Sequence, residues 1–183
     1  MNDTDTGIEK ETIPFLYNKD SDPKTIEVKY TISGSTFKTH LPTFKEGSAE
    51  QMLHFLYEFN QAKNKLGYTT YQKLESGIEQ LLQGSARNEW NTIKSTVNPN
   101  VNTMASFTAR IEAFRLLYIP EPAAIDNQKN YLRRVKKNDK FTVPQFLDRL
   151  KHINLLLSQF PNATVQDCFS EEEIKLFSIM RCP

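Results

Sequence analysis

The stretch that decides the fold of this chain runs from residue 41 to residue 90. It contains Leu41-Pro-Thr-Phe-Lys-Glu-Gly47, Phe55-Leu-Tyr-Glu-Phe59 and Leu81-Leu-Gln-Gly-Ser-Ala-Arg-Asn-Glu-Trp90. A proline fixes the start, aromatic residues follow at helical spacing, a glycine breaks the pattern, and an alanine stands four positions before the only tryptophan. These features specify how helices pack, and none supplies catalytic chemistry. The pattern therefore favours a surface built for partners over an active site.

Composition places the chain among ordinary globular proteins. It has 183 residues, of which 38% are hydrophobic and 25% charged, with a formal net charge of +1. This length suits one large domain or two small ones, and the balanced charge gives no global attraction to nucleic acid or membranes. No apolar run approaches the ~20 residues that span a bilayer, and the polar N-terminus predicts no secretory signal. We therefore expect a cytoplasmic protein without a membrane partner.

Residues able to bind metals or to act as nucleophiles are few and scattered. Cys168 and Cys182 lack the spacing of a metal or redox site, so we expect two reduced thiols. His40, His54 and His152 lie far apart, and no two have the spacing that zinc binding on one helix requires. A catalytic Cys–His pair lacks a nucleophile turn and an oxyanion loop. We expect no enzymatic activity, no metal and no cofactor.

The chain begins with polar sequence and then changes to a strand pattern. Residues 1–24 lack helical periodicity, and we expect this segment to be flexible. From Thr25 the apolar residues alternate with polar ones, and a second alternating run follows Ser33-Gly34. Two such runs around a glycine turn predict a β-hairpin over residues 25–40. Because a lone hairpin is marginally stable, it should lie against helices.

Everything after residue 41 has helical periodicity. Ser48 and Gln51 form a capping-box pattern that starts the first helix near Ala49. Further helices are predicted over about residues 70–83, 86–97, 103–118, 123–137, 143–157 and 170–180. Pro120 and Pro122 stop any helix, so they mark a boundary between a domain of residues 25–120 and one of residues 121–183.

The helices before this boundary should converge on Trp90. Its spacing from Ala86 and Ile93 places it on an apolar helix face, where a core role is far more common than ligand stacking. Met104, Ile111 and Leu117 or Tyr118 are expected on the apolar face of the fourth helix. The predicted core comprises Phe55, Phe59, Leu82, Ala86, Trp90, Phe107 and Phe114.

One charged cluster suggests a function. Residues 129–151 contain eight Lys or Arg residues against two Asp residues. Arg133, Lys136, Lys137 and Lys140 share a face if the helix continues through them. The cluster is either a solvated helix surface or a contact with another subunit or a polyanion. The candidate contact residues are Lys129, Arg133, Arg134, Lys136, Lys137 and Lys140.

The order and spacing of these motifs over residues 41–183 resemble the capsid region of Gag from Gypsy-type LTR retrotransposons and their domesticated relatives. That family opens with Pro-x-Phe-x-Gly and Phe-Leu-x-x-Phe, matched at 42–47 with the glycine one residue late, and at 55–59. Its Leu-x-Gly-x-Ala-x-x-Trp motif is matched by Leu82, Gly84 and Ala86, with Trp90 one position late.

The second half of the chain resembles the same family, with two departures. Residues 132–136, 143–146 and 177–183 match its later segments. The family normally has further helices where this chain ends, so we expect the second domain to be truncated. No zinc-knuckle spacing is present, so RNA packaging would rest mainly on a segment outside this chain.

The resemblance implies a particular fold and function. The fold is an all-α, two-lobed, retroviral-capsid-like helical bundle with a short N-terminal hairpin. The function is a structural one, in which copies associate through helix faces into a virus-like particle that encloses RNA. Two alternatives remain open. One is a domesticated adaptor that binds peptides at the hairpin edge, and the other is a helical nucleic-acid-binding module that uses residues 129–151.

Overall fold

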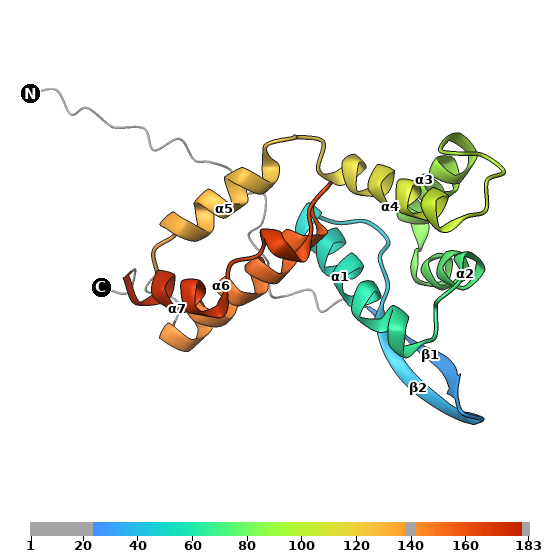
Figure 1. Ribbon diagram of the computed structural model, residues 1–183, viewed down its shortest axis with the longest axis horizontal. Coiled ribbons are helices and arrows are strands. Elements are labelled where there is room, and N and C mark those ends of the chain that lie inside the picture. The colour runs from blue at the N-terminus through green and yellow to red at the C-terminus, as the bar shows by residue number, and fades with distance from the viewer. Residues whose placement is uncertain (1–23, 138–141, 181–183) are drawn as a thin grey trace, which may run out of the picture.

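A computed structural model of the chain describes residues 24–137 and 142–180, and in these residues it consists of a hairpin followed by seven α-helices (Figure 1). The strands are β1 (Thr25–Ile32) and β2 (Ser35–Pro42). The helices are α1 (Ala49–Lys65), α2 (Tyr71–Leu81), α3 (Gly84–Thr96), α4 (Met104–Tyr118), α5 (Ala124–Arg134), α6 (Val143–Leu156) and α7 (Glu171–Met180). The predicted all-α character with a short hairpin is confirmed. Flexibility is predicted for residues 1–24, and this prediction lies outside the described residues for all of them except Lys24.

The hairpin forms where the alternating pattern predicts it and extends two residues further. β1 and β2 pair antiparallel, from Thr25 opposite Pro42 to Ile32 opposite Ser35. The backbone of Ser33 has φ 49° and that of Gly34 has φ 81°. Two consecutive left-handed residues match the right-handed twist of paired strands, which explains why this dipeptide makes the turn.

The start of α1 follows from its first four residues. The Ser48 hydroxyl accepts a hydrogen bond from the backbone N–H of Gln51, and the Gln51 side chain accepts one from the backbone N–H of Ser48. This is the predicted capping box. Gly67, with φ 68°, follows the end of α1, and the Thr70 side chain then caps α2.

The stretch 41–90 folds back on itself. The Phe44 backbone N–H donates to Leu81 O at 3.0 Å, and the Gln83 N–H donates to Phe44 O at 2.8 Å. These bonds bring the Phe44 ring against Phe55, with ring centroids 5.7 Å apart. The segment after the hairpin is therefore tied to the α2–α3 junction.

The core between α1 and α4 surrounds Trp90. Its indole is fully buried and meets Phe107 and Phe114 edge to face, at centroid distances of 6.1 and 5.9 Å. All seven predicted core residues are buried: Phe55, Phe59, Leu82, Ala86, Trp90, Phe107 and Phe114.

The apolar face predicted for α4 is wrong at Met104, and of the two alternatives Leu117 and Tyr118 it is Tyr118 that packs against the core. Met104 is 49% exposed and Leu117 is 55% exposed. The buried face of α4 is instead centred on Phe107, Arg110 and Phe114. Met104, the first residue of the helix, and Leu117 lie outside this face. An arginine occupies the middle of it, so the inward face cannot be identified from hydrophobicity alone.

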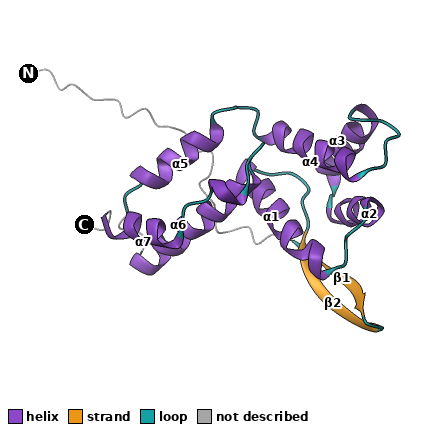
Figure 2. Cartoon of the chain, viewed as in Figure 1, coloured by secondary structure: helices purple, strands orange, loops and turns teal. Residues whose placement is uncertain are grey.

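The chain leaves α4 at Ile119 and passes Pro120 and Pro122 before α5 begins, as the two prolines predict. α1 lies in the middle of the molecule, with α2, α3 and α4 on one side and α5, α6 and α7 on the other (Figures 1 and 2). α1 contacts both α4 and α6. The division into two domains stays a prediction.

Candidate interaction surfaces

The basic segment does not form the predicted helical face. α5 ends at Arg134 instead of residue 137, because Val135 has an extended backbone with ψ 134°. Continuing the helix would stack Arg133 on Lys136 and Lys137, and like charges at this spacing destabilise a helix. Lys140 lies outside the described residues. The predicted extension of this helix to residue 137 is therefore wrong, and the condition under which Arg133, Lys136 and Lys137 would share a helical face is not met.

Two of the basic candidates contact other parts of the same chain. The Lys129 ammonium donates to Asp167 Oδ1 at 2.7 Å. This bond, followed by the Thr164 backbone N–H, holds the pKa of Asp167 below its usual value. The Arg133 guanidinium lies 5.0 Å from the centroid of the Phe169 ring. These contacts fasten α5 to the segment before α7, so the two cations have a structural role.

The outer side of α7 presents apolar side chains to solvent. Leu176, Ile179 and Met180 are 52%, 72% and 66% exposed. They lie at i, i+3 and i+4, so they share one face, which we call the α7 face. The buried side of α7 carries Ile174 and Ser178. α7 is thus apolar on two sides, and only one of them is covered in the described structure.

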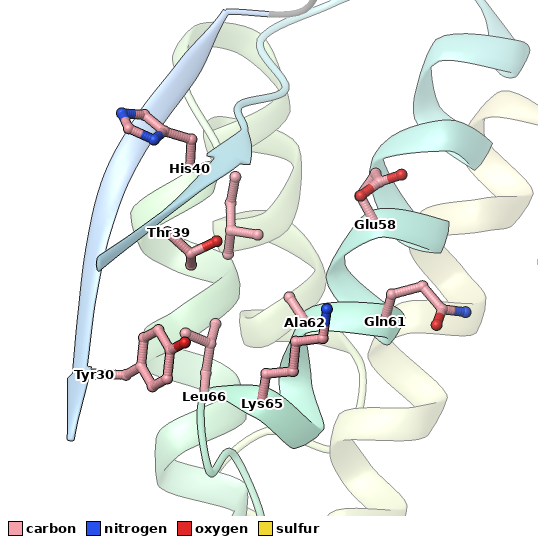
Figure 3. A pocket seen from close by; sticks show the side chains of 9 residues that line it. Tyr30, Thr39, His40, Glu58, Gln61, Ala62, Lys65 and Leu66 are labelled. Carbon is pink, nitrogen blue, oxygen red and sulfur yellow. The ribbon is translucent and has the colours of Figure 1, made fainter. Parts of the chain in front are cut away.

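A shallow pocket of about 110 Å³ lies between the hairpin and α1 (Figure 3). Leu41, Ala62 and Leu66 give it an apolar lining. Glu58 and Lys65 stand on the α1 side, and within residues 24–137 and 142–180 neither side chain forms an ion pair. Figure 3 shows Tyr30 and Thr39 on the hairpin side. The pocket thus has a mixed lining, in which these three apolar side chains lie among polar ones that include one carboxylate and one ammonium.

The contact between α1 and α6 contains a charge cluster that the sequence analysis missed. Glu50 on α1 is 1% exposed, and its two carboxylate oxygens accept hydrogen bonds from Arg149 on α6 at 2.5 and 3.1 Å. The His152 Nε2 lies 3.6 Å from Glu50 Oε1. The rings of His54 and His152 lie 5.4 Å apart. The fold therefore brings together two histidines that the sequence placed on separate elements.

The environment of His152 favours its neutral form. Burial, followed by the neighbouring His54 and Arg149, lowers the pKa of His152 to about 4. The signal available in the sequence was local: Glu50 and His54 are four apart on α1, and Arg149 and His152 are three apart on α6. Each pair faces one way on its helix, but nothing local shows that the two faces meet.

The described structure offers no metal site and no membrane span. In residues 24–137 and 142–180, no group of three or more His, Cys, Asp or Glu residues is arranged to hold a metal ion. No helix in that part of the chain is long and apolar enough to cross a bilayer. Among models of protein families, curated proteins and solved structures, no match to this chain is found.

Proposed function

We propose that this chain is a structural Gag-type capsid protein that self-associates through helix faces into a virus-like particle enclosing RNA. In this proposal its lobes are capsid-like, it has no enzymatic activity, and it acts in cytoplasmic particles without a membrane partner. The mostly helical fold supports the proposal, as does the burial of the aromatic and small residues that carry the resemblance. The observation that carries it is the exposed α7 face, formed by Leu176, Ile179 and Met180.

Covering the α7 face is favourable because its side chains are mostly exposed to water. Each Å² of apolar surface removed from water contributes about 25 cal/mol. Three side chains make a small interface, too small for a tight isolated dimer. A closed shell repeats such a contact many times, and many weak contacts then hold it together.

The charges beside the α7 face favour a second copy of this chain as the occupant. The first turn of α7 is acidic, with Glu171, Glu172 and Glu173. The basic end of α5 lies next to it, because Arg133 contacts Phe169, which directly precedes Ser170 and the first turn of α7. A surface with adjacent acidic and basic patches is self-complementary under a two-fold axis, which places each patch against the opposite patch of the other copy.

Sedimentation velocity over a range of concentrations tests this proposal. Ile179→Glu places a charge in the centre of the α7 face, and we expect it to weaken self-association by at least about tenfold. Val101→Glu is the matched control, because Val101 is an exposed apolar residue in the α3–α4 loop. Equal association of both variants and the parent chain would overturn the proposal. Negative-stain microscopy of the protein should show regular particles that Ile179→Glu abolishes.

The pocket between β2 and α1 favours a second candidate function, that of a peptide-binding adaptor. β2 pairs with β1 along one edge, and in the two-stranded sheet its other edge has no strand partner. An extended peptide added there would place side chains near Glu58 and Lys65.

Nuclear magnetic resonance titration with extended hexapeptides distinguishes this function from shell formation. Peptides that alternate valine with glutamate or with lysine serve as probes. Binding at the pocket should shift the amide resonances of residues 35–42. The effect should be lost in Lys65→Glu and kept in Lys73→Glu, a charge reversal on the exposed side of α2. Absence of shifts with every peptide would remove this candidate.

A further inference from the structure

The contact between α1 and α6 combines a buried ion pair with a pair of histidines. Glu50 and Arg149, 99 positions apart in sequence, form two hydrogen bonds through both oxygens of the carboxylate. The guanidinium and the carboxylate neutralise one another, and Glu50 is almost fully removed from water. The ion pair has no net charge left with which to balance a third ionised group.

The two imidazoles lie beside this pair. The His54 Nδ1 is buried and has no hydrogen-bond partner in residues 24–137 and 142–180. The titratable and charged groups at the contact come from three helices. They are Glu50 and His54 on α1, Tyr131 on α5, and Arg149 and His152 on α6. Tyr131 interacts electrostatically with both Arg149 and Glu50.

We propose that the α1–α6 contact is an acid-sensitive latch, which holds at neutral pH and releases α6 from α1 when the imidazole of His152, which faces that of His54 across the contact, takes up a proton. The latch is a property of the fold and does not depend on whether the chain assembles into a shell. It adds a conformational control that the proposed function does not require.

The charges at the contact explain why protons would open it. An imidazolium at His152 stands beside His54 and near Arg149, and both disfavour its charge. Glu50 lies 3.6 Å away, but its carboxylate already accepts two hydrogen bonds from Arg149, so it compensates little of the added charge. Protonation therefore leaves the contact with excess positive charge in a partly dry environment.

The direction of the pH effect follows from the lowered pKa of His152. Its pKa is about 4 in the closed contact against an ordinary value of 6.5, so the open form binds the proton more tightly. The closed contact is fully favoured above pH 6.5 and loses this advantage as the pH falls towards 4. We expect the open-to-closed ratio to rise about tenfold between pH 7.5 and pH 5. A pKa change from 6.5 to about 4 would by itself give a larger rise in this ratio. We expect a smaller one because 31% of the His152 side chain is exposed to water, which weakens the electrostatic effect.

Release should be local because no other pair of facing histidines is present in the described residues. The chain has three histidines, and the third, His40, lies on β2. Residues 71–118, which form α2, α3 and α4, contain none. The Trp90 core should therefore stay folded over the pH range in which the latch opens.

Nuclear magnetic resonance of the whole chain tests the latch. Imidazole resonances give the pKa of His152 directly, and backbone resonances report on α6 and on residues 71–118 separately. The latch requires a pKa for His152 at least one unit below 6.5, with α6 resonances changing in the same pH range while those of residues 71–118 do not. His54→Gln with His152→Gln should abolish the α6 change, and His40→Gln should leave it intact.

Three results would overturn the proposal. The first is an ordinary pKa for His152, and the second is an α6 transition of unchanged pH dependence in the double glutamine variant. The third is simultaneous loss of the Trp90 core, which would indicate general acid unfolding. If the double variant does not fold at pH 7.5, the titration of the parent chain decides the question alone.

Discussion

Arg110 and Arg149 each meet a buried glutamate, but their surroundings differ. Arg110, which is 2% exposed, donates to three backbone oxygens at the end of α3 and in the following loop, and to the Tyr71 hydroxyl at 2.7 Å. Its partner Glu75 also pairs with Lys94 at 3.1 Å. Arg149 pairs with Glu50 beside two imidazoles. Backbone carbonyls, whose charge does not change with pH, supply three of the hydrogen bonds of Arg110, whereas two imidazoles lie beside the Arg149 pair.

This difference separates a structural pair from a responsive one. The backbone carbonyls around Arg110 do not change their charge with pH, so we expect these hydrogen bonds between α4 and the residues after α3 to persist in mild acid. The Glu50–Arg149 contact is also an attraction between opposite charges, but the neighbouring His152 gains a positive charge in acid. The presence of a buried ion pair therefore does not by itself show that a contact is insensitive to pH. The groups around the pair decide this.

The largest expected effect lies at the centre of the fixed region. Trp90→Ala removes a fully buried indole whose N–H has no acceptor in the described residues, so its contribution is apolar packing. We expect a loss of about 3–5 kcal/mol in unfolding free energy, measured by urea unfolding followed by circular dichroism. Trp90→Phe, which keeps an aromatic ring, should lose less. A native fluorescence emission that is red-shifted and readily quenched would contradict the burial of Trp90.

The next effect tests the fixed ion pair. Arg110→Met keeps much of the side-chain volume but leaves the carbonyls at the end of α3 without their donor and leaves buried Glu75 with the partly exposed Lys94 as its remaining ion-pair partner in the described residues. We expect a loss of about 3 kcal/mol in the same urea experiment, because an uncompensated buried charge costs several kcal/mol. Arg87→Met, at an exposed position on α3, is the control and should change stability by less than about 0.5 kcal/mol. Equal stability of the two variants would remove Arg110 from this role.

The responsive pair should tolerate substitution better. Glu50→Gln removes the charge that faces Arg149, but the Arg149 side chain is 19% exposed and has access to water. We expect a loss of about 1–3 kcal/mol at pH 7.5. Adding Arg149→Met to Glu50→Gln should recover part of the loss, since no unpaired cation then remains. A double variant that loses the sum of both single effects would show that the two residues are not coupled.

Features set by neighbouring residues could be predicted from the sequence. The hairpin turn at Ser33-Gly34 and the capping box of Ser48 and Gln51 are each determined within four residues. The burial of Trp90 also followed from helical spacing, because its face repeats every three or four residues. In each case the local pattern has one favourable structural solution.

Features set by distant residues could not be predicted in this way. Arg110 is buried because carbonyls at residues 97, 98 and 101 accept its hydrogen bonds, and a charged residue in a helix otherwise indicates an exposed position. The meeting of His54 with His152 depends on how α6 packs on α1. The predicted end of α5 is too late because lysine and arginine favour a helix individually, whereas their mutual repulsion at helical spacing opposes it.

The smallest expected effect concerns the basic segment after α5. Lys136 is exposed and follows the end of the helix, so Lys136→Ala should change the unfolding free energy by less than about 0.5 kcal/mol. Its effect on RNA distinguishes the two interpretations of the basic cluster. Fluorescence anisotropy with single-stranded RNA at several salt concentrations gives the slope of log affinity against log salt. A lysine that contacts phosphate should reduce this slope by roughly one when removed. Because Lys129 and Arg133 already bind groups of the same chain, we expect Lys136→Ala to match the control Lys73→Ala, with an unchanged slope, as a solvated surface requires. A reduced slope in Lys136→Ala alone would assign the segment to a polyanion.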